Sequence, residues 1–296
     1  MKYLRTRIIW LLAVTICLAM LSSFAQAHEG LHEQIVAITA KIKRDPKNAT
    51  LYLQRGELHR LHREWTRAAA DYDRAARLEP ELKVIDLVRG KMLLESGRLQ
   101  RARVTLDRFL TQQPSHFEGL VTRARVLAGL GATNDAIKDF TEALAVSPDP
   151  ELYLERAHAT APDSRVSVRD ARVSGRDATQ PREQKRIEDA LNGLDEGSKR
   201  LGPVVTLQLA AIDLELRRHN YDAALARLDI VMSQSERKET WLVRRGEILA
   251  LAGRKDEARS SFQDALTAID SLPPSRRQTR SMTALQLRIR SALGAR

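Results

Sequence analysis

Apolar residues recur at helical spacing along most of the chain. One stripe, near the N-terminal end, consists of Leu31, Ile35, Ile38 and Ile42. Another stripe, at the C-terminal end, consists of Met282, Leu285, Ile289 and Leu293. Spacing of three or four residues places such side chains on one face of an α-helix. The pattern therefore predicts a helix within residues 28–48 and another within residues 273–296.

A 34-residue period organises the chain between these two helices. Four prolines follow one another at this interval: Pro46, Pro80, Pro114 and Pro148. Four more series keep the same phase: Gly56, Gly90 and Ala124; Ala68, Ala102 and Ala136; Tyr72, Leu106 and Phe140; and Ala75, Phe109 and Ala143. Five series in phase indicate an internal repeat. Each unit has room for two helices of about 12 residues joined by short turns.

The residue types of the repeat fit a helical hairpin. Small residues at the Gly56 and Ala68 positions allow two helices to approach closely, and a bulky residue at the Tyr72 position fills the space between them. Proline ends the second helix because it cannot continue the hydrogen-bond ladder. A single hairpin cannot bury both of its apolar faces, so we expect neighbouring hairpins to stack into a solenoid.

These residues resemble the tetratricopeptide repeat family. Leu51-Tyr52-Leu53-Gln54-Arg55-Gly56, followed by Trp65, Ala68, Tyr72, Ala75 and Pro80, matches the family pattern across one whole repeat. The resemblance implies an all-α, right-handed α-solenoid that binds other proteins. One departure is systematic, because the family often has Leu before the first small residue and this chain has Arg: Arg55, Arg89, Arg123, Arg156 and Arg245. We interpret these arginines as structural, with aliphatic stems packed between helices, and keep ligand binding as the alternative.

Extending the phase gives six repeats, which begin near residues 49, 83, 117, 150, 205 and 239. The fourth is interrupted, because the interval from Ala157 to Ala190 is much longer than the equivalent interval from Gly56 to Ala68. The predicted organisation is a signal peptide (1–27), a capping half-repeat (28–48), repeats 1–3 with the first helix of repeat 4 (49–161), a mobile polar insertion (162–182), the remaining repeats (183–272) and a basic C-terminal capping helix (273–296). A functional flap is the alternative for the insertion.

Residues 1–27 are typical of a secretory signal peptide. Three basic residues precede the apolar run from Ile8 to Leu21, and a small-residue site, Ala25-Gln26-Ala27, follows it. This order predicts cleavage between Ala27 and His28, and hence a periplasmic or secreted protein. An uncleaved anchor is the alternative, but the apolar run is short for one. The leader would also remove the chain's only cysteine, so no disulfide would support the mature protein.

Composition and charge narrow the choice of partners. The 296 residues include 49 Lys and Arg against 38 Asp and Glu, a net charge of +11, and 4% aromatic residues. Loss of three basic residues with the leader lowers the net charge to +8. Most of the excess lies in two stretches, 83–116 and 273–296. Because the charge is local and export is expected, we predict no nucleic-acid partner, and an acidic partner would bind at these two stretches.

The strongest chemical motif is His28-Glu29-Gly30-Leu31-His32, which has the HExxH pattern of zinc proteases. It begins at the predicted mature N-terminus, contains a helix-weakening Gly and has no evident third ligand, so we do not expect protease activity. A weaker hypothesis is copper binding by the new α-amine and His28, with His32 adding a nitrogen. With no nucleophile elbow, phosphate loop or mature thiol, we predict a non-enzymatic protein without cofactors.

The family resemblance implies a ligand-binding concave surface formed by the first helices of the repeats. The corresponding residues are Leu53, Glu57, Arg60, Leu87, Lys91, Val121, Arg125, Leu209, Asp213, Arg217, Val243 and Glu247. This mixture of apolar and charged groups suits a peptide or another helix. We therefore predict an interaction scaffold of the bacterial cell envelope. The alternatives are a periplasmic copper-binding or delivery protein that uses His28 and a binder of anionic envelope ligands through its basic surfaces.

Overall fold

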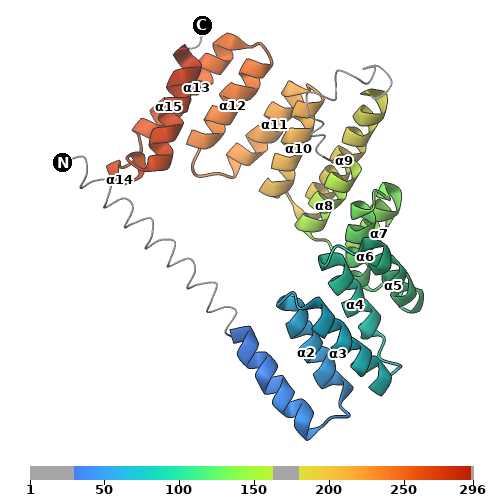
Figure 1. The fold of residues 1–296 in the computed structure, drawn as a ribbon. Helices are drawn as coiled ribbons and strands as arrows, with labels where there is room; N and C mark the ends of the chain where they lie inside the picture. The colour runs from blue at the N-terminus through green and yellow to red at the C-terminus, as the bar shows by residue number, and fades with distance from the viewer. Residues whose placement is uncertain (1–29, 163–179, 295–296) are drawn as a thin grey trace, which may run out of the picture. The chain divides into compact units, whose positions relative to one another are not determined.

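The computed structural model describes residues 30–162 and 180–294, and every regular element in those two ranges is a helix (Figure 1). A helix over residues 30–44 comes first. In the same ranges, six A helices, the first of each repeat, are α2 (Ala49–Leu61), α4 (Val84–Glu95), α6 (Phe117–Gly129), α8 (Pro150–Thr160), α10 (Val205–Arg217) and α12 (Glu239–Leu251). Their B helices follow them in turn: α3 (Trp65–Leu78), α5 (Leu99–Gln112), α7 (Thr133–Val146), α9 (Gln180–Leu201), α11 (Tyr221–Ser233) and α13 (Lys255–Asp270). The described chain ends with α14 (Pro274–Arg277) and α15 (Arg280–Gly294). The all-α fold class predicted from the sequence is confirmed.

The helices form two compact units, Met1–Asp139 and Phe140–Arg296, with the division inside α7. In the first unit, α2 packs on α3 and α4 on α5, and the core includes Tyr72, Ile85 and Met92. In the second unit, α8 packs on α9, α10 on α11 and α12 on α13. One hydrophobic core of this unit runs from Ile212 on α10 to Ile289 on α15. Each pairing is a helical hairpin of the kind that the repeat period predicts.

In three hairpins a glycine of the A helix faces a bulky residue of the B helix. A Cβ atom placed on Gly56 would lie 2.6 Å from the Tyr72 ring, and one on Gly246 would lie 2.7 Å from the Phe262 ring. Gly90 stands in the same relation to Leu106. In the fourth repeat a different pair of positions makes a similar contact, because Gly197 of the B helix faces Tyr153 of the A helix. The glycines therefore set how closely the paired helices approach.

The turn from A helix to B helix needs a left-handed backbone at one position. Gly97, Gly131 and Gly253 have φ between 74° and 76°, and a non-glycine residue occupies the same place in the first and fifth repeats, with φ of 57° at Arg63 and 58° at His219. L-residues with a side chain adopt this region at a cost of about 1–2 kcal/mol. The two turns therefore carry strain that their glycine counterparts avoid.

The arginine row ties consecutive helices together. Arg123 on α6 donates to Asp139 at 2.6 and 2.8 Å and to Asp107 on α5 at 3.0 Å. Asp139 and Asp107 have the same sequence separation from Arg123, one after it and one before it. Three other arginines contact residues at one or both of these sequence separations: Arg55 contacts Asp71 and Thr39, Arg89 contacts Asp73, and Arg245 contacts Asp229. The fifth, Arg156, donates to Thr141 and Glu196. The structural role predicted for the row is confirmed.

The fifth repeat keeps the ion pair but exchanges its residues. Ala211 occupies the place of the arginine, and Arg227, on the B helix, occupies the place that an aspartate holds in repeats 1 and 3. Arg227 instead donates to Asp195 of the preceding B helix, at 2.7 and 2.9 Å. Hydrogen bonding to Asp195 is the main cause that raises the pKa of Arg227 above its ordinary value. The guanidinium of the fifth repeat therefore comes from the B helix instead of the A helix, and it still links neighbouring B helices.

The ends of the described chain are closed by half-repeats. Thr39, in the helix over residues 30–44, accepts a hydrogen bond from Arg55 at 3.2 Å, as a side chain of a preceding B helix would. At the other end, α15 packs on α13 and buries Met282 and Ile289. The helix breaks between α14 and α15, where the Thr279 hydroxyl accepts from the Met282 amide at 3.4 Å and caps α15. Arg276, Arg280 and Arg290 are exposed, and their binding to anionic ligands stays a prediction.

Two segments predicted from the sequence, the signal peptide and the polar insertion, lie wholly or mostly outside the described residues. The signal peptide predicted for 1–27 lies outside the described residues, as do residues 163–179 of the predicted insertion. The helix α9 begins at Gln180, before the boundary predicted at residue 183. Its first two turns are polar and contain Pro181 at a position that suits the start of a helix, so they lack the apolar pattern that marked its later part. In the part of the chain that the structure describes, we find no helix with the length and apolar character needed to span a membrane.

The strained turns give a reciprocal test of the repeat. We expect Arg63→Gly to raise the free energy of unfolding by about 0.5–1 kcal/mol, because glycine adopts φ near 57° without a Cβ penalty. The reverse change at the equivalent turn, Gly97→Arg, should lower it by about 1 kcal/mol. Urea denaturation followed by circular dichroism measures both. Equal destabilisation by both variants would contradict the interpretation, since it would mean that the backbone conformation does not set the cost.

A second prediction concerns the arginine row. We expect Arg123→Met to lower the free energy of unfolding by about 1–3 kcal/mol, because it leaves the Asp139 carboxylate, only 3% exposed, without its partner. The double variant Arg123→Met/Asp139→Leu should recover much of that loss, because it removes the uncompensated charge as well. Arg67→Met is the matched control, since Arg67 is 69% exposed and its loss should cost less than about 0.5 kcal/mol. Strictly additive losses in the double variant would show that the ion pair has no structural role.

Candidate functional site

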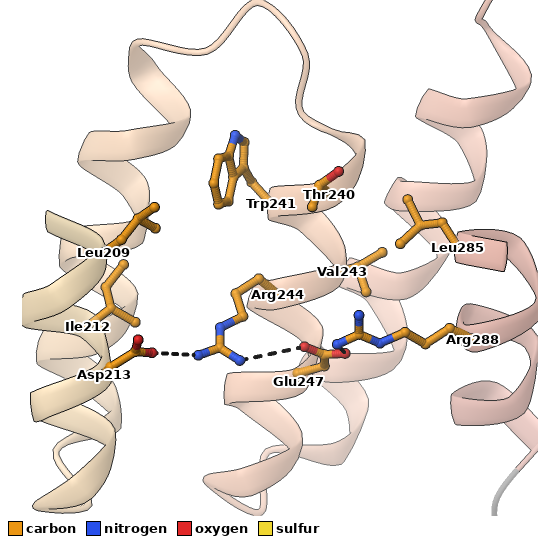
Figure 2. Close-up of a pocket in the computed structure, with 10 residues that line it drawn as sticks. All are labelled: Leu209, Ile212, Asp213, Thr240, Trp241, Val243, Arg244, Glu247, Leu285 and Arg288. Carbon is orange, nitrogen blue, oxygen red and sulfur yellow. Dashed lines mark hydrogen bonds and ion pairs between the residues drawn. The ribbon is translucent and has the colours of Figure 1, made fainter. Parts of the chain in front are cut away.

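The A helices α10 and α12 and the terminal helix α15 enclose a cavity of about 240 Å³ (Figure 2). All three helices belong to the second unit. The cavity lies on the surface that successive A helices share, and α15 provides the wall that a further A helix would provide. The residues that line it are Leu209, Ile212 and Asp213 of α10, Thr240, Trp241, Val243, Arg244 and Glu247 of α12, and Leu285 and Arg288 of α15.

One part of the cavity is apolar. Ile212 and Val243 are buried in the helix packing, and Leu209 and Leu285 are half-buried on either side of α12. Trp241, in the first turn of α12, is held by its indole N–H, which donates to the Ser235 hydroxyl at 3.0 Å. The apolar residues therefore present a fixed surface, with one half-buried indole ring, to a side chain that enters from outside.

A row of alternating charges crosses the cavity (Figure 2). Arg244 pairs with Asp213 of α10 at 3.0 Å and with Glu247, one turn later on α12, at 3.9 Å. Glu247 in turn pairs with Arg288 of α15. The order across the three helices is thus Asp213, Arg244, Glu247 and Arg288. The four charges balance, so the cavity as a whole favours neither sign.

The structure brings together four of the residues predicted for a concave site, namely Leu209, Asp213, Val243 and Glu247. Sequence reasoning missed the other members of the cavity as site residues: Ile212, Thr240, Trp241, Arg244, Leu285 and Arg288. A signal for α15 was present, because Leu285 lies in the apolar stripe of the predicted terminal helix. That stripe indicated only which face is apolar, and the placement of α15 as a wall of the cavity depends on its packing against α13.

The predicted residues of the first repeat take part in a charged network. Arg60 on α2 donates to Glu57, one turn earlier, at 3.1 Å and also pairs with Glu95 of α4. The Tyr72 hydroxyl donates to Glu57. Burial and this hydrogen bond raise the pKa of Tyr72 well above its ordinary value. Glu57 and Arg60 therefore link neighbouring helices, and Leu53 lies half-buried beside the core that includes Tyr72.

Leu87 and Val121 need a correction, because they are 2% and 5% exposed and belong to the helix packing instead of an open surface. Lys91 pairs with Glu118 and so connects α4 to α6. Arg125 is exposed. In the first unit, therefore, the predicted residues are spread between the helix packing and ion pairs.

Arg217 also has a role other than the predicted one. Its guanidinium donates to the carbonyl oxygens of Ala161 at 2.9 Å and Pro162 at 3.2 Å, and it pairs with Glu183 of α9. These contacts join the C-terminal end of α8 to the first turns of α9. Arg217 therefore holds the two helices of the fourth repeat against α10, and its contact with a partner stays a prediction.

The histidines do not form a metal site in residues 30–162 and 180–294, where no cluster of three metal-binding side chains occurs. His32 is exposed, whereas His28 lies outside the described residues, so copper binding there stays a prediction. His59 is buried, and its Nδ1 lies 2.6 Å from a Glu64 oxygen. His116 caps α6, since its Nδ1 accepts from the Gly119 amide at 3.2 Å.

Comparison with known proteins agrees with the repeat. A tetratricopeptide repeat model matches residues 87–152, and a tetratricopeptide repeat-like domain model matches residues 170–288. The second match includes the whole cavity. The chain belongs to the tetratricopeptide repeat family. No curated protein matches its sequence.

Solved structures with a similar fold have low sequence identity. A tetratricopeptide repeat protein from Parabacteroides merdae is 18% identical, with a TM-score of 0.50, over 91% of this chain and 96% of that one. The C-terminal part of a repeat protein from Cytophaga hutchinsonii is 10% identical, with a TM-score of 0.61, over 86% and 94% of the two chains. PilW, a type IV pilus biogenesis factor, is 17% identical, with a TM-score of 0.52, over 71% and 90%. These likenesses support the all-α solenoid fold.

Proposed function

We propose that the protein is a non-enzymatic scaffold of the bacterial cell envelope that binds a peptide or helical segment of a partner in the cavity between α10, α12 and α15. The observation that supports this most directly is the cavity itself, in which apolar side chains from three helices surround a row of charges. Apolar pockets with a few fixed polar groups give affinity and orientation together. Membership of the tetratricopeptide repeat family supports a protein or peptide partner.

The chemistry of the cavity supports binding over catalysis. Its four charged side chains pair with one another across three helices, and its other polar group is the Thr240 hydroxyl. Catalysis by a nucleophile or a general base needs such a group held against a second one that activates it. The charges of this cavity instead orient whatever enters it.

The envelope location rests on the sequence of residues 1–27. A basic start, the apolar run from Ile8 to Leu21 and the Ala25-Gln26-Ala27 site are the features that export machinery uses. A protein without cysteine in its exported part would need no oxidation to fold there. The scaffold would therefore meet partners of the periplasm or of the membrane surfaces that face it.

Capture of a partner tests the binding site. We expect Leu285→Asp to reduce the amount of partner recovered from envelope extract by at least about tenfold, because a carboxylate in the apolar wall would have to be desolvated. Leu287→Asp is the matched control, since Leu287 lies on the same helix, is 63% exposed and does not line the cavity. Circular dichroism checks that both variants remain helical. Equal losses, or no loss, in the two variants would contradict the assignment.

Cell fractionation tests the location. We expect the protein in the periplasmic or secreted fraction, with an N-terminus at His28 when the purified protein is sequenced. Ala25→Asp and Ala27→Asp together should block cleavage, because the cleavage site needs small residues. A protein that remains in the cytoplasm with an intact leader would refute the envelope part of the proposal and would leave the binding site unaffected.

A further inference from the structure

The charged row of the cavity is most open at its two ends. The side chains of Asp213 and Arg288 are 71% and 61% exposed, whereas Arg244 and Glu247 between them are 37% and 23% exposed. Asp213 uses one carboxylate oxygen for Arg244, and Arg288 uses one terminal nitrogen for Glu247. Each end residue therefore keeps hydrogen-bonding capacity that faces solvent.

The two open ends carry opposite charges, on helices that flank the apolar part of the cavity (Figure 2). A negative end lies on α10 and a positive end on α15. A ligand with acidic groups at both ends would meet Asp213, and one with basic groups at both ends would meet Arg288. Like charges brought together in this way oppose binding. The row thus favours a ligand that has one charge of each sign.

The size of the cavity limits what lies between those charges. Sites for small-molecule ligands usually measure about 300–1,000 Å³. This cavity, at about 240 Å³, is smaller and suits an apolar side chain placed over Leu209, Val243 and Leu285. The remainder of the ligand would lie along the surface, as the backbone of an extended peptide does.

Helix geometry gives the spacing of the charges. Closely packed helices lie about 8–10 Å apart, and α12 is not closely packed on α10 or on α15, so the two successive gaps between these helices span at least about 16–20 Å. An extended chain advances about 3.3–3.6 Å per residue, so the distance corresponds to at least about five or six residues of extended peptide.

We propose that the cavity selects an extended peptide segment with a basic side chain at one end, a carboxylate at least about five or six residues away and a leucine-like side chain between them. The inference rests on the proposed function and specifies the partner's chemistry. The basic group pairs with Asp213, the carboxylate pairs with Arg288, and the apolar side chain enters beside Trp241. Because the peptide can run in either direction along the groove, the two charges can occur in either order.

Three peptides test the selection: acetylated, amidated Lys-Ala-Ala-Leu-Ala-Ala-Glu, and the forms with Lys or with Glu at both ends. Titration of isotope-labelled protein, followed at the indole N–H resonance of Trp241 and assigned with Trp241→Phe, measures weak binding directly. We expect the mixed-charge peptide to bind about three- to fivefold more tightly than either other peptide at low salt, as partly exposed ion pairs allow. The advantage should decrease at high salt.

Two substitutions locate the effect. Arg288→Gln should abolish the preference for the mixed-charge peptide over the form with Lys at both ends, and Asp213→Asn should abolish its preference over the form with Glu at both ends. Arg290→Gln is the matched control, because Arg290 is an exposed arginine of α15 that does not line the cavity. Circular dichroism confirms that each variant folds. A preference that survives Arg288→Gln would overturn the assigned contact.

The remaining outcomes separate this inference from the proposed function. Equal binding of the three peptides, lost in Leu285→Asp, would overturn the charge selection and keep the site. Absence of binding by all three, while Leu285→Asp still prevents capture of the partner, would also overturn the inference alone. Failure of the capture experiment itself would refute the proposed function.

Discussion

The close approach of the two helices in each hairpin is the constraint on which the rest of the structure depends. A small residue on one helix and a bulky one on its partner, as in Gly56 and Tyr72, determine how near the helices come. That distance places the neighbouring residues of the same two helices, Arg55 and Asp71, within reach of a 2.8 Å hydrogen bond. Core packing and charge pairing therefore depend on the same distance between the two helices, and neither would persist if the helices separated.

The fifth repeat shows that neighbouring B helices can be linked by different residues. Where Ala211 replaces an arginine of the A helix, Arg227 of α11 donates directly to Asp195 of α9. In the fourth repeat, a glycine and an aromatic ring, Gly197 and Tyr153, meet at repeat positions other than those of Gly56 and Tyr72. Repeats can therefore diverge in sequence while their stacking remains the same.

The repeat could be predicted from the sequence because one unit recurs along the chain, so weak preferences at single positions add together. The candidate site was only partly predicted. Leu209 and Val243, which line this cavity, share a repeat position with Leu87 and Val121 of the first unit. The cavity depends on neighbouring helices, since α15 packs on α13 and contributes Leu285 and Arg288 to the lining. Contacts between residues far apart in the sequence, such as Glu247 with Arg288, have no local pattern that could reveal them.

The contacts of Arg217 have a consequence for the order of folding. A hairpin normally closes through its own short turn, which costs little chain entropy. In the fourth repeat, residues 163–179 separate Pro162 from Gln180, so the connection is much longer than the other turns. The carbonyl oxygens at the end of α8 and Glu183 of α9 both bind one guanidinium of the fifth repeat. Closure of this hairpin is therefore coupled to the docking of α10. Docking of α10 would offset part of the chain entropy that this long connection costs.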